Sequence, residues 1–147
     1  MGGDYTGKSP VHRGRLGAKR SVLTDGNGMP LSIISSKAKR NDRTLFTATM
    51  NDSIIGLKMG SMLKMDKGYS GHEIKEWTQR KYGIEVNVPP NANQKPRPYD
   101  ISGRWKVERT FAWMNAFRGL ATRYERKRDY HDSLLHFWAV LVWGNRR

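Results

Sequence analysis

A tight-turn signal near the start of the chain limits what it can fold into. Residues 25–28 read Asp-Gly-Asn-Gly, and glycine and asparagine accept the positive φ angles that short turns between strands require. Strand-like patterns flank this signal at residues 20–24 and 30–36. The sequence therefore predicts a β-hairpin over residues 20–36, preceded by a basic, glycine-rich and irregular connector at residues 1–19.

Helical and strand-like patterns alternate after the hairpin. A helix capped by Asn41 or Asp42 comes first, and Ser70 and Gly83 are expected to cap and to end the helix after it. The later segments are a strand-helix-strand unit over residues 61–90 (strands 61–65 and 84–88, helix 71–82), a proline-rich loop at 91–103, and two C-terminal helices within 103–143 (103–120 and 131–142). Alternating strands and helices predict a single α/β domain over residues 1–147, with helices covering the sheet.

A large excess of basic residues points to a polyanionic partner. The 147 residues carry 27 Lys and Arg against 13 Asp and Glu, a formal net charge of +14. Such an excess favours DNA, RNA or an anionic membrane surface. No run of about 18 apolar residues is present, so no membrane span is expected. No secretion signal is expected at the start, and the absence of cysteine excludes disulfides and thiolate metal sites.

Two acidic residues stand out against this basic background. Asp66 ends an apolar-leaning run and can project from a strand end, where α/β sheets place functional side chains. Glu108 lies among arginines in an aromatic helical stretch. Carboxylates in a positive surround can bind divalent metal beside a phosphate backbone, so phosphodiester chemistry is the first hypothesis. Asp66 could instead be a turn residue. Glu108 could form a helical ion pair with Arg104, worth about 0.3–0.5 kcal/mol.

Other side chains carry weaker signals. The four histidines share no metal-ligand spacing, and His136 is expected to be a packed helix residue. Gly26 and Gly28 lie in the predicted hairpin turn rather than before a helix, so a phosphate-binding loop is not expected. No serine lies in a nucleophile-elbow sequence. The aromatic residues are expected to form core rather than a base-stacking surface: Trp105, Phe111, Trp113, Phe117, Phe137, Trp138 and Trp143.

Several motifs, in a fixed order, resemble a known family. They are residues 10–20 (PVHRGRLGAKR), 23–31 (LTDGNGMPL), 66–69 (DKGY) and 104–120 (RWKVERTFAWMNAFRGL), the last continuing to Arg123-Tyr124-Glu125. With these motifs, residues 8–147 resemble the C-terminal part of bacterial insertion-sequence transposases of the DDE type. The resemblance implies an RNase H-like mixed sheet flanked by helices.

The resemblance also implies a metal-dependent mechanism. In this family three carboxylates hold two Mg²⁺ ions, about 3.5–4 Å apart, which activate the attacking hydroxyl and stabilise the leaving oxygen. Asp66 matches the second aspartate and Glu108 the glutamate, so both are expected to be catalytic residues and metal ligands. Arg104 matches the family's arginine four residues before that glutamate. Asn115 stands where the family often has a lysine, and Ile101 where it often has a tyrosine.

No residue of the chain matches the first aspartate. The family places that acid on the opening strand of the fold, upstream of the segment that corresponds to residues 1–19, and Asp4, Asp25 and Asp42 do not match it. The chain is therefore expected to be a partial, N-terminally truncated RNase H-like domain that lacks the opening central strand. We expect it to be unstable or inactive alone, as a remnant or as the downstream frame of a split element.

The resemblance further implies the partners. The expected substrate is double-stranded DNA at the element ends and at the target. The expected assembly is a homo-oligomer or a complex with an upstream frame product. The expected location is the bacterial cytoplasm, near the nucleoid. The alternatives are a non-catalytic basic DNA-binding fragment that regulates or complements a full transposase, and an RNA-binding protein, against which the motif order argues. The expected DNA contacts are Lys67, Arg104, Arg109, Asn115, Arg118 and Arg123, with Arg126, Lys127 and Arg128 as further basic candidates.

Overall fold

The computed structural model describes residues 6–8, 16–53, 55–90 and 102–145. Its contacts divide the chain into two compact units, residues 1–54 with 105–147 and residues 55–104. In the first unit lie β1 (Gly7–Lys8), β2 (Leu16–Thr24), β3 (Pro30–Lys37), α1 (Asp42–Asn51), α3 (Arg104–Ala116, whose first residue belongs to the second unit), α4 (Arg118–Ala121) and α5 (Arg128–Gly144). The second unit holds β4 (Met62–Lys64), the short 3-10 helix η1 (Lys67–Tyr69), α2 (His72–Tyr82) and β5 (Glu85–Asn87). The single domain over residues 1–147 stays a prediction.

The predicted hairpin is confirmed, and it is longer than expected. β2 and β3 pair antiparallel from Ala18 opposite Lys37 to Thr24 opposite Pro30, with one irregularity at the turn end. β1 occupies Gly7–Lys8 and β2 begins at Leu16, so the prediction that residues 1–19 are irregular is wrong at both places. The reason is that these residues find pairing partners: Leu16 and Gly17 pair with β1, and Ala18 pairs with the end of β3.

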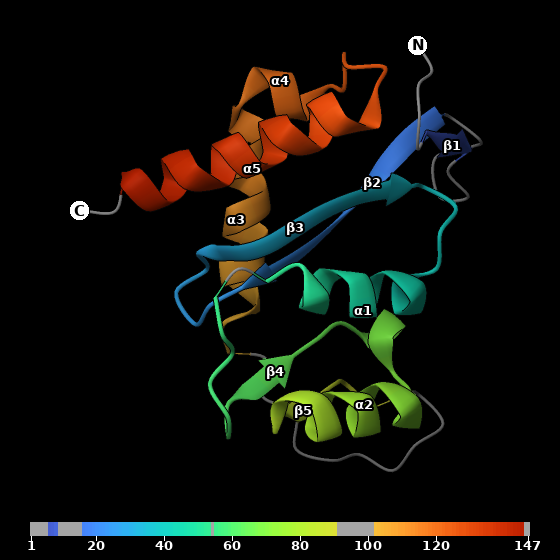
Figure 1. The fold of residues 1–147 in the computed structure, drawn as a ribbon, viewed down its shortest axis with the longest axis vertical. Helices are drawn as coiled ribbons and strands as arrows, with labels where there is room; N and C mark the ends of the chain where they lie inside the picture. Colours follow the sequence, from blue (N-terminus) through green and yellow to red (C-terminus); the bar gives the residue numbers. More distant parts are fainter. Residues whose placement is uncertain (1–5, 9–15, 54, 91–101, 146–147) are drawn as a thin grey trace. The chain divides into compact units, whose positions relative to one another are not determined.

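Helices α1 and α5 cover opposite faces of this hairpin (Figure 1). Alternate residues of a strand point to opposite faces. Ile33 packs in a cluster with residues of α5, whereas the neighbouring Ser32 donates to Asp52 Oδ2 (3.0 Å), at the end of α1. On the α1 face, Thr49 Oγ1 also lies 2.7 Å from Ser21 Oγ. Asn41 caps α1 as predicted, because its side chain accepts from the amide of Arg43.

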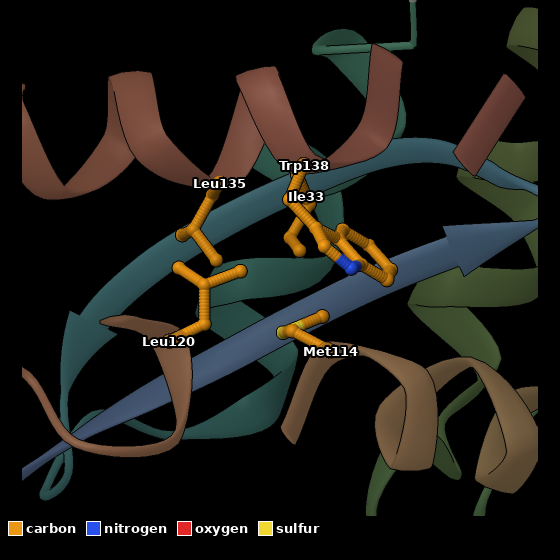
Figure 2. Close-up of a cluster of buried hydrophobic side chains, with 5 residues drawn as sticks. All are labelled: Ile33, Met114, Leu120, Leu135 and Trp138. Carbon is orange, nitrogen blue, oxygen red and sulfur yellow. The ribbon is translucent and has the colours of Figure 1, made fainter. Parts of the chain in front are cut away.

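Five buried side chains form the centre of the first unit. Figure 2 shows Ile33 of β3, Met114 of α3, Leu120 of α4, and Leu135 and Trp138 of α5, each at most 3% exposed. Full burial of an aliphatic side chain stabilises a fold by about 1.5–3 kcal/mol. The cluster joins three helices to one strand, so it holds the first unit together.

A break at Phe117 divides the helix that the sequence predicts as continuous over residues 103–120. α3 ends at Ala116, Phe117 is extended (φ −83°, ψ 106°), and the single turn α4 begins at Arg118. The amide of Leu120 donates to Phe117 O (2.8 Å), and Leu120 is only 2% exposed. The break therefore coincides with the entry of Leu120 into the core. The last helix exists as predicted, but it extends beyond residues 131–142 at both ends.

The aromatic core predicted for α3 is mostly wrong. Trp105 (55%), Trp113 (39%) and Phe117 (37%) are exposed, and only Phe111 packs against the core. The buried residues of α3 are instead Thr110 and Met114, spaced four apart on one face. In α5, Trp138 is buried as expected, but Phe137 is 56% exposed and does not belong to the buried cluster. His136 is also exposed, so its predicted packing is wrong.

The second unit is the predicted strand-helix-strand segment. β4 and β5 pair in parallel, Met62 opposite Glu85 through Lys64 opposite Asn87, and α2 connects them. Gly83 ends α2 in the left-handed conformation (φ 62°), as predicted. The predicted cap by Ser70 is wrong, because α2 begins after Gly71, which offers no side chain to cap it. The α/β class is confirmed, and none of the described helices is long and apolar enough to cross a membrane.

A pair of substitutions in α5 tests the core. Leu135→Ala should lower the free energy of unfolding by about 2–5 kcal/mol, because Leu135 is fully buried and truncation leaves a cavity. Val140→Ala, on the exposed side of the same helix, should change it by less than about 0.5 kcal/mol. Urea titrations followed by circular dichroism measure both values. Equal losses would contradict this core.

Candidate functional site

Asp66 lies just beyond the end of a parallel strand. The amide of Met65 donates to Asn87 O (3.0 Å), so pairing with β5 continues to the residue before Asp66. Asp66 then caps η1, and its Oδ1 accepts from the amide of Lys67 (2.7 Å). The carboxylate remains 69% exposed. The residue therefore presents its charge to solvent at a strand end, as the sequence predicts, while also serving as a local cap.

Cations of the second unit lie beside this carboxylate. Arg104 Nη2 is 3.9 Å from Asp66 Oδ1, and both side chains are at least half exposed. Such a pair contributes at most about 1 kcal/mol. Lys64 Nζ donates to the backbone carbonyl of Ser102 (2.8 Å), which holds the segment before Arg104 to β4. The structure thus brings Asp66, Lys67 and Arg104 together, three of the residues singled out by the sequence.

Glu108 lies on α3 in the first unit. Its side chain is exposed and makes no hydrogen bond or ion pair with the residues that the structure describes. The helical ion pair considered for it does not form, since Arg104 contacts Asp66 instead. Glu108 is therefore an exposed acid that has no ionic partner among the described residues of this basic chain. A free carboxylate in such a surround is available to a cation.

The neighbours of Glu108 are bound to the hairpin turn. Arg109 Nη2 donates to Asn27 O. Its Cζ lies 4.7 Å from the centroid of the Trp105 ring and 4.6 Å from that of the Trp113 ring. Lys106 donates to the carbonyl of Gly26. Arg109 is thus engaged inside the protein, so its use as a phosphate contact, which stays a prediction, would compete with these interactions.

The remaining predicted DNA contacts have different environments. Asn115 accepts from Arg20 Nη2 (2.9 Å), and Arg123 Nε donates to the carbonyl of Glu125 (3.0 Å), so both are occupied by the protein. Arg118 is exposed, and its side chain has no hydrogen bond or ion pair within the described chain. Of these three side chains, Arg118 is the one that is free to bind a phosphate.

A buried histidine at the start of α5 lies beside an acid of the preceding loop, and the sequence does not reveal its burial. His131 is 2% exposed, and its Nδ1 is 3.9 Å from Glu125 Oε2. Burial lowers the pKa of His131 from its usual 6.5, and the charges of Arg123 and Arg20 lower it further, against the opposite effects of Asp132 and Glu125. Burial also lowers the pKa of Arg20. Nothing in the local sequence separates the buried His131 from the exposed His136.

The donor chemistry of the two acids fits Mg²⁺. Carboxylate oxygens are ligands that this cation prefers. The contacts of Asp66 with the described residues use Oδ1 and leave Oδ2 available, and both oxygens of Glu108 are free within that part of the chain. No group of three or more His, Cys, Asp or Glu residues that could hold a metal lies together in the described ranges. Asp66 and Glu108 belong to different compact units, each described by itself.

Comparisons with known proteins agree with the motifs. The family model for the transposase DDE domain matches residues 2–135. A protein of Burkholderia cepacia, named as a transposase for insertion sequence element IS402, is 34% identical over 151 residues, which cover 95% of this chain and 69% of that protein. No solved structure gives a significant match.

The buried histidine predicts a pH-dependent stability. The pKa of His131 in the folded chain lies below 6.5, its ordinary value in the unfolded chain. At a pH between these two pKa values, the unfolded chain binds a proton at this histidine and the folded chain does not. The free energy of unfolding should therefore fall as pH drops from about 7.5 through 6.5, by at most about 1.4 kcal/mol per pH unit. His131→Gln should flatten this slope, and His136→Gln, at an exposed position, should not. Urea titrations at several pH values measure it, and equal slopes for His131→Gln and wild type would contradict the assignment.

Proposed function

This chain belongs to the family of bacterial DDE transposases, and we propose that it supplies two metal-binding carboxylates, Asp66 and Glu108, for Mg²⁺-dependent cleavage and joining of DNA strands. The observation that carries the proposal is the pair of exposed acids at the family's second and third motif positions in a chain of net charge +14. Each has at least one carboxylate oxygen that makes no contact with the described residues. The two acids would hold the ions together, and bound Mg²⁺ would activate the attacking hydroxyl and stabilise the leaving oxygen.

The surrounding cations have a separate role in this proposal. Lys67 and Arg104 lie beside Asp66, and Arg104 is also four residues before Glu108 in the sequence. Arginine binds phosphate oxygens in a planar, bidentate geometry, and lysine binds them as a point charge. We therefore assign to Lys67 and Arg104 the orientation of the scissile phosphate. Arg118 would contact the DNA backbone further away.

The finer expectations also belong to this proposal. We propose an RNase H-like arrangement that lacks its opening central strand, a homo-oligomer or an upstream product that supplies the first aspartate, and a location at the nucleoid of the bacterial cytoplasm. A chain with two of the three acids should bind metal more weakly. The 147-residue polypeptide alone should therefore not nick terminal-repeat DNA with Mg²⁺, and activity should need a complemented reaction, in which the upstream part of a family transposase is added.

A non-catalytic DNA-binding role is the second candidate. The net charge of +14 favours it, because a basic excess binds DNA phosphates whether or not the chain is catalytic. In that role the chain would regulate or complement a full transposase through hetero-oligomers. The two functions differ in whether the carboxylates matter.

Neutral variants of the two acids distinguish the functions. In the complemented reaction, Asp66→Asn or Glu108→Gln should lower strand cleavage by more than about 100-fold, the upper end for residues that merely orient a metal ligand. Binding to the same DNA should persist or strengthen, because each variant removes a negative charge. Asp129→Asn and Glu73→Gln, at exposed acids outside the motifs, are the controls. Cleavage that survives both motif variants would favour the non-catalytic role.

The salt dependence of DNA binding tests the proposed phosphate contact of Arg118. Arg118→Gln should reduce the slope of log K against log salt concentration by about 0.9, the value for one lost phosphate contact. Arg80→Gln, at an exposed residue beside Glu76, should leave the slope unchanged. Fluorescence anisotropy with labelled duplex DNA at several salt concentrations measures both. Equal slopes for wild type and Arg118→Gln would remove Arg118 from the interface.

A further inference from the structure

Three side chains of α3 bind three consecutive backbone carbonyls of the β2–β3 turn. Lys106 donates to Gly26 O, Arg109 donates to Asn27 O, and Thr110 Oγ1 lies 2.5 Å from Gly28 O. We call this set, Lys106, Arg109 and Thr110 with the carbonyls of residues 26–28, the turn clamp. All of it lies within the first compact unit. It joins two of the sequence motifs, residues 23–31 and 104–120.

The turn side of the clamp is locally rigid. Asp25 Oδ1 accepts from the amides of Asn27 and Met29, both at 2.8 Å. Gly28 has a φ of 80°, a backbone conformation that residues other than glycine rarely adopt. A Cβ atom at this position would lie 3.0 Å from Lys106 O and 3.2 Å from Arg109 Nη2. The turn therefore holds its three carbonyls in one geometry and brings α3 too close for a side chain at residue 28.

The helix side of the clamp determines the direction of Glu108. Residues of an α-helix are separated by about 100° around the axis, so Glu108 lies about 160° from both Lys106 and Thr110 and about 100° from Arg109. The clamp holds the side of α3 opposite Glu108. This agrees with the burial, since Thr110 is fully buried and Glu108 is exposed.

We propose that the turn clamp is a positioning device for the Glu108 carboxylate, and that Thr110 and Gly28 are positioning residues for DNA strand cleavage. The inference rests on the proposed function of Glu108. It gives the turn sequence of residues 25–28 and the residues that flank Glu108 one common role. A carboxylate displaced by about 1 Å can lower a reaction rate by about 100-fold, so the register of α3 on the turn matters for catalysis.

Thr110 offers the sharpest test, because it is buried and is not an expected DNA contact. Thr110→Val keeps the shape and removes the hydroxyl, and Thr110→Ser restores it. In the complemented reaction, Thr110→Val should lower the turnover of bound DNA by about 10- to 100-fold, while the Kd for DNA stays within about twofold. Thr78→Val, at another fully buried helical threonine whose hydroxyl bonds its own helix, should leave turnover unchanged.

A second readout does not depend on activity. Amide hydrogen exchange of the 147-residue chain, followed by mass spectrometry, should accelerate over residues 104–112 in Thr110→Val and return to wild-type rates in Thr110→Ser. Gly28→Ala should produce the same change from the turn side. Because both substitutions act on one contact, their effects on turnover should be less than additive in the double variant.

Each outcome has a defined meaning. Unchanged turnover in Thr110→Val, with or without faster exchange in α3, overturns the positioning role. Cleavage that survives Glu108→Gln overturns the proposed function itself, whatever Thr110→Val does. If Thr110→Val fails to fold, as circular dichroism would show, Lys106→Met replaces it at a half-buried member of the clamp. A fall in its turnover at constant Kd supports the inference, and unchanged turnover overturns it.

Discussion

The antiparallel pairing of β2 and β3 is the constraint on which the first unit depends. Its two faces carry different helices, with Ile33 on the side of α5 and Ser32 on the side of α1. The end of the pair holds α3 through the carbonyls of the turn. A ladder of backbone hydrogen bonds thus sets where three helices lie. The indole of Trp143 adds a further link, since it donates to Pro30 O (2.8 Å) and ties the end of α5 to the start of β3.

Local chemistry made part of this fold predictable. The turn at residues 25–28, the Asn41 cap and the left-handed Gly83 each depend on the conformational preferences of a few adjacent residues, and all three occur. The break at Phe117 coincides with the burial of Leu120 against residues distant in the chain, and the nearest glycine, Gly119, lies beyond the break, inside α4. The same limit explains the aromatic side chains of α3. Periodicity predicts that one face is buried but does not reveal that Thr110 and Met114 form it.

Some features of the candidate site could likewise be predicted from local sequence, and others depend on tertiary contacts. Asp66 and Glu108 could be recognised as acids in a basic surround, and the structure gives each an exposed carboxylate with cations close to Asp66. The partners of Lys106 and Arg109 are backbone carbonyls about 80 residues away, which carry no side-chain signature in the sequence. The buried His131 is likewise indistinguishable from His136 until tertiary contacts are known. The roles proposed for the two acids come from the family resemblance. The contacts that hold α3, which carries Glu108, to the turn come from tertiary packing.

The cation–π contacts of Arg109 with Trp105 and Trp113 have a spectroscopic consequence. One guanidinium touches two indole rings while its Nη2 holds the carbonyl of Asn27. A movement of that carbonyl therefore alters the electric field at both chromophores, and the emission of an indole responds to its field. The protein carries an intrinsic optical reporter, built from unmodified residues, at the boundary between its hairpin and the helix that bears Glu108.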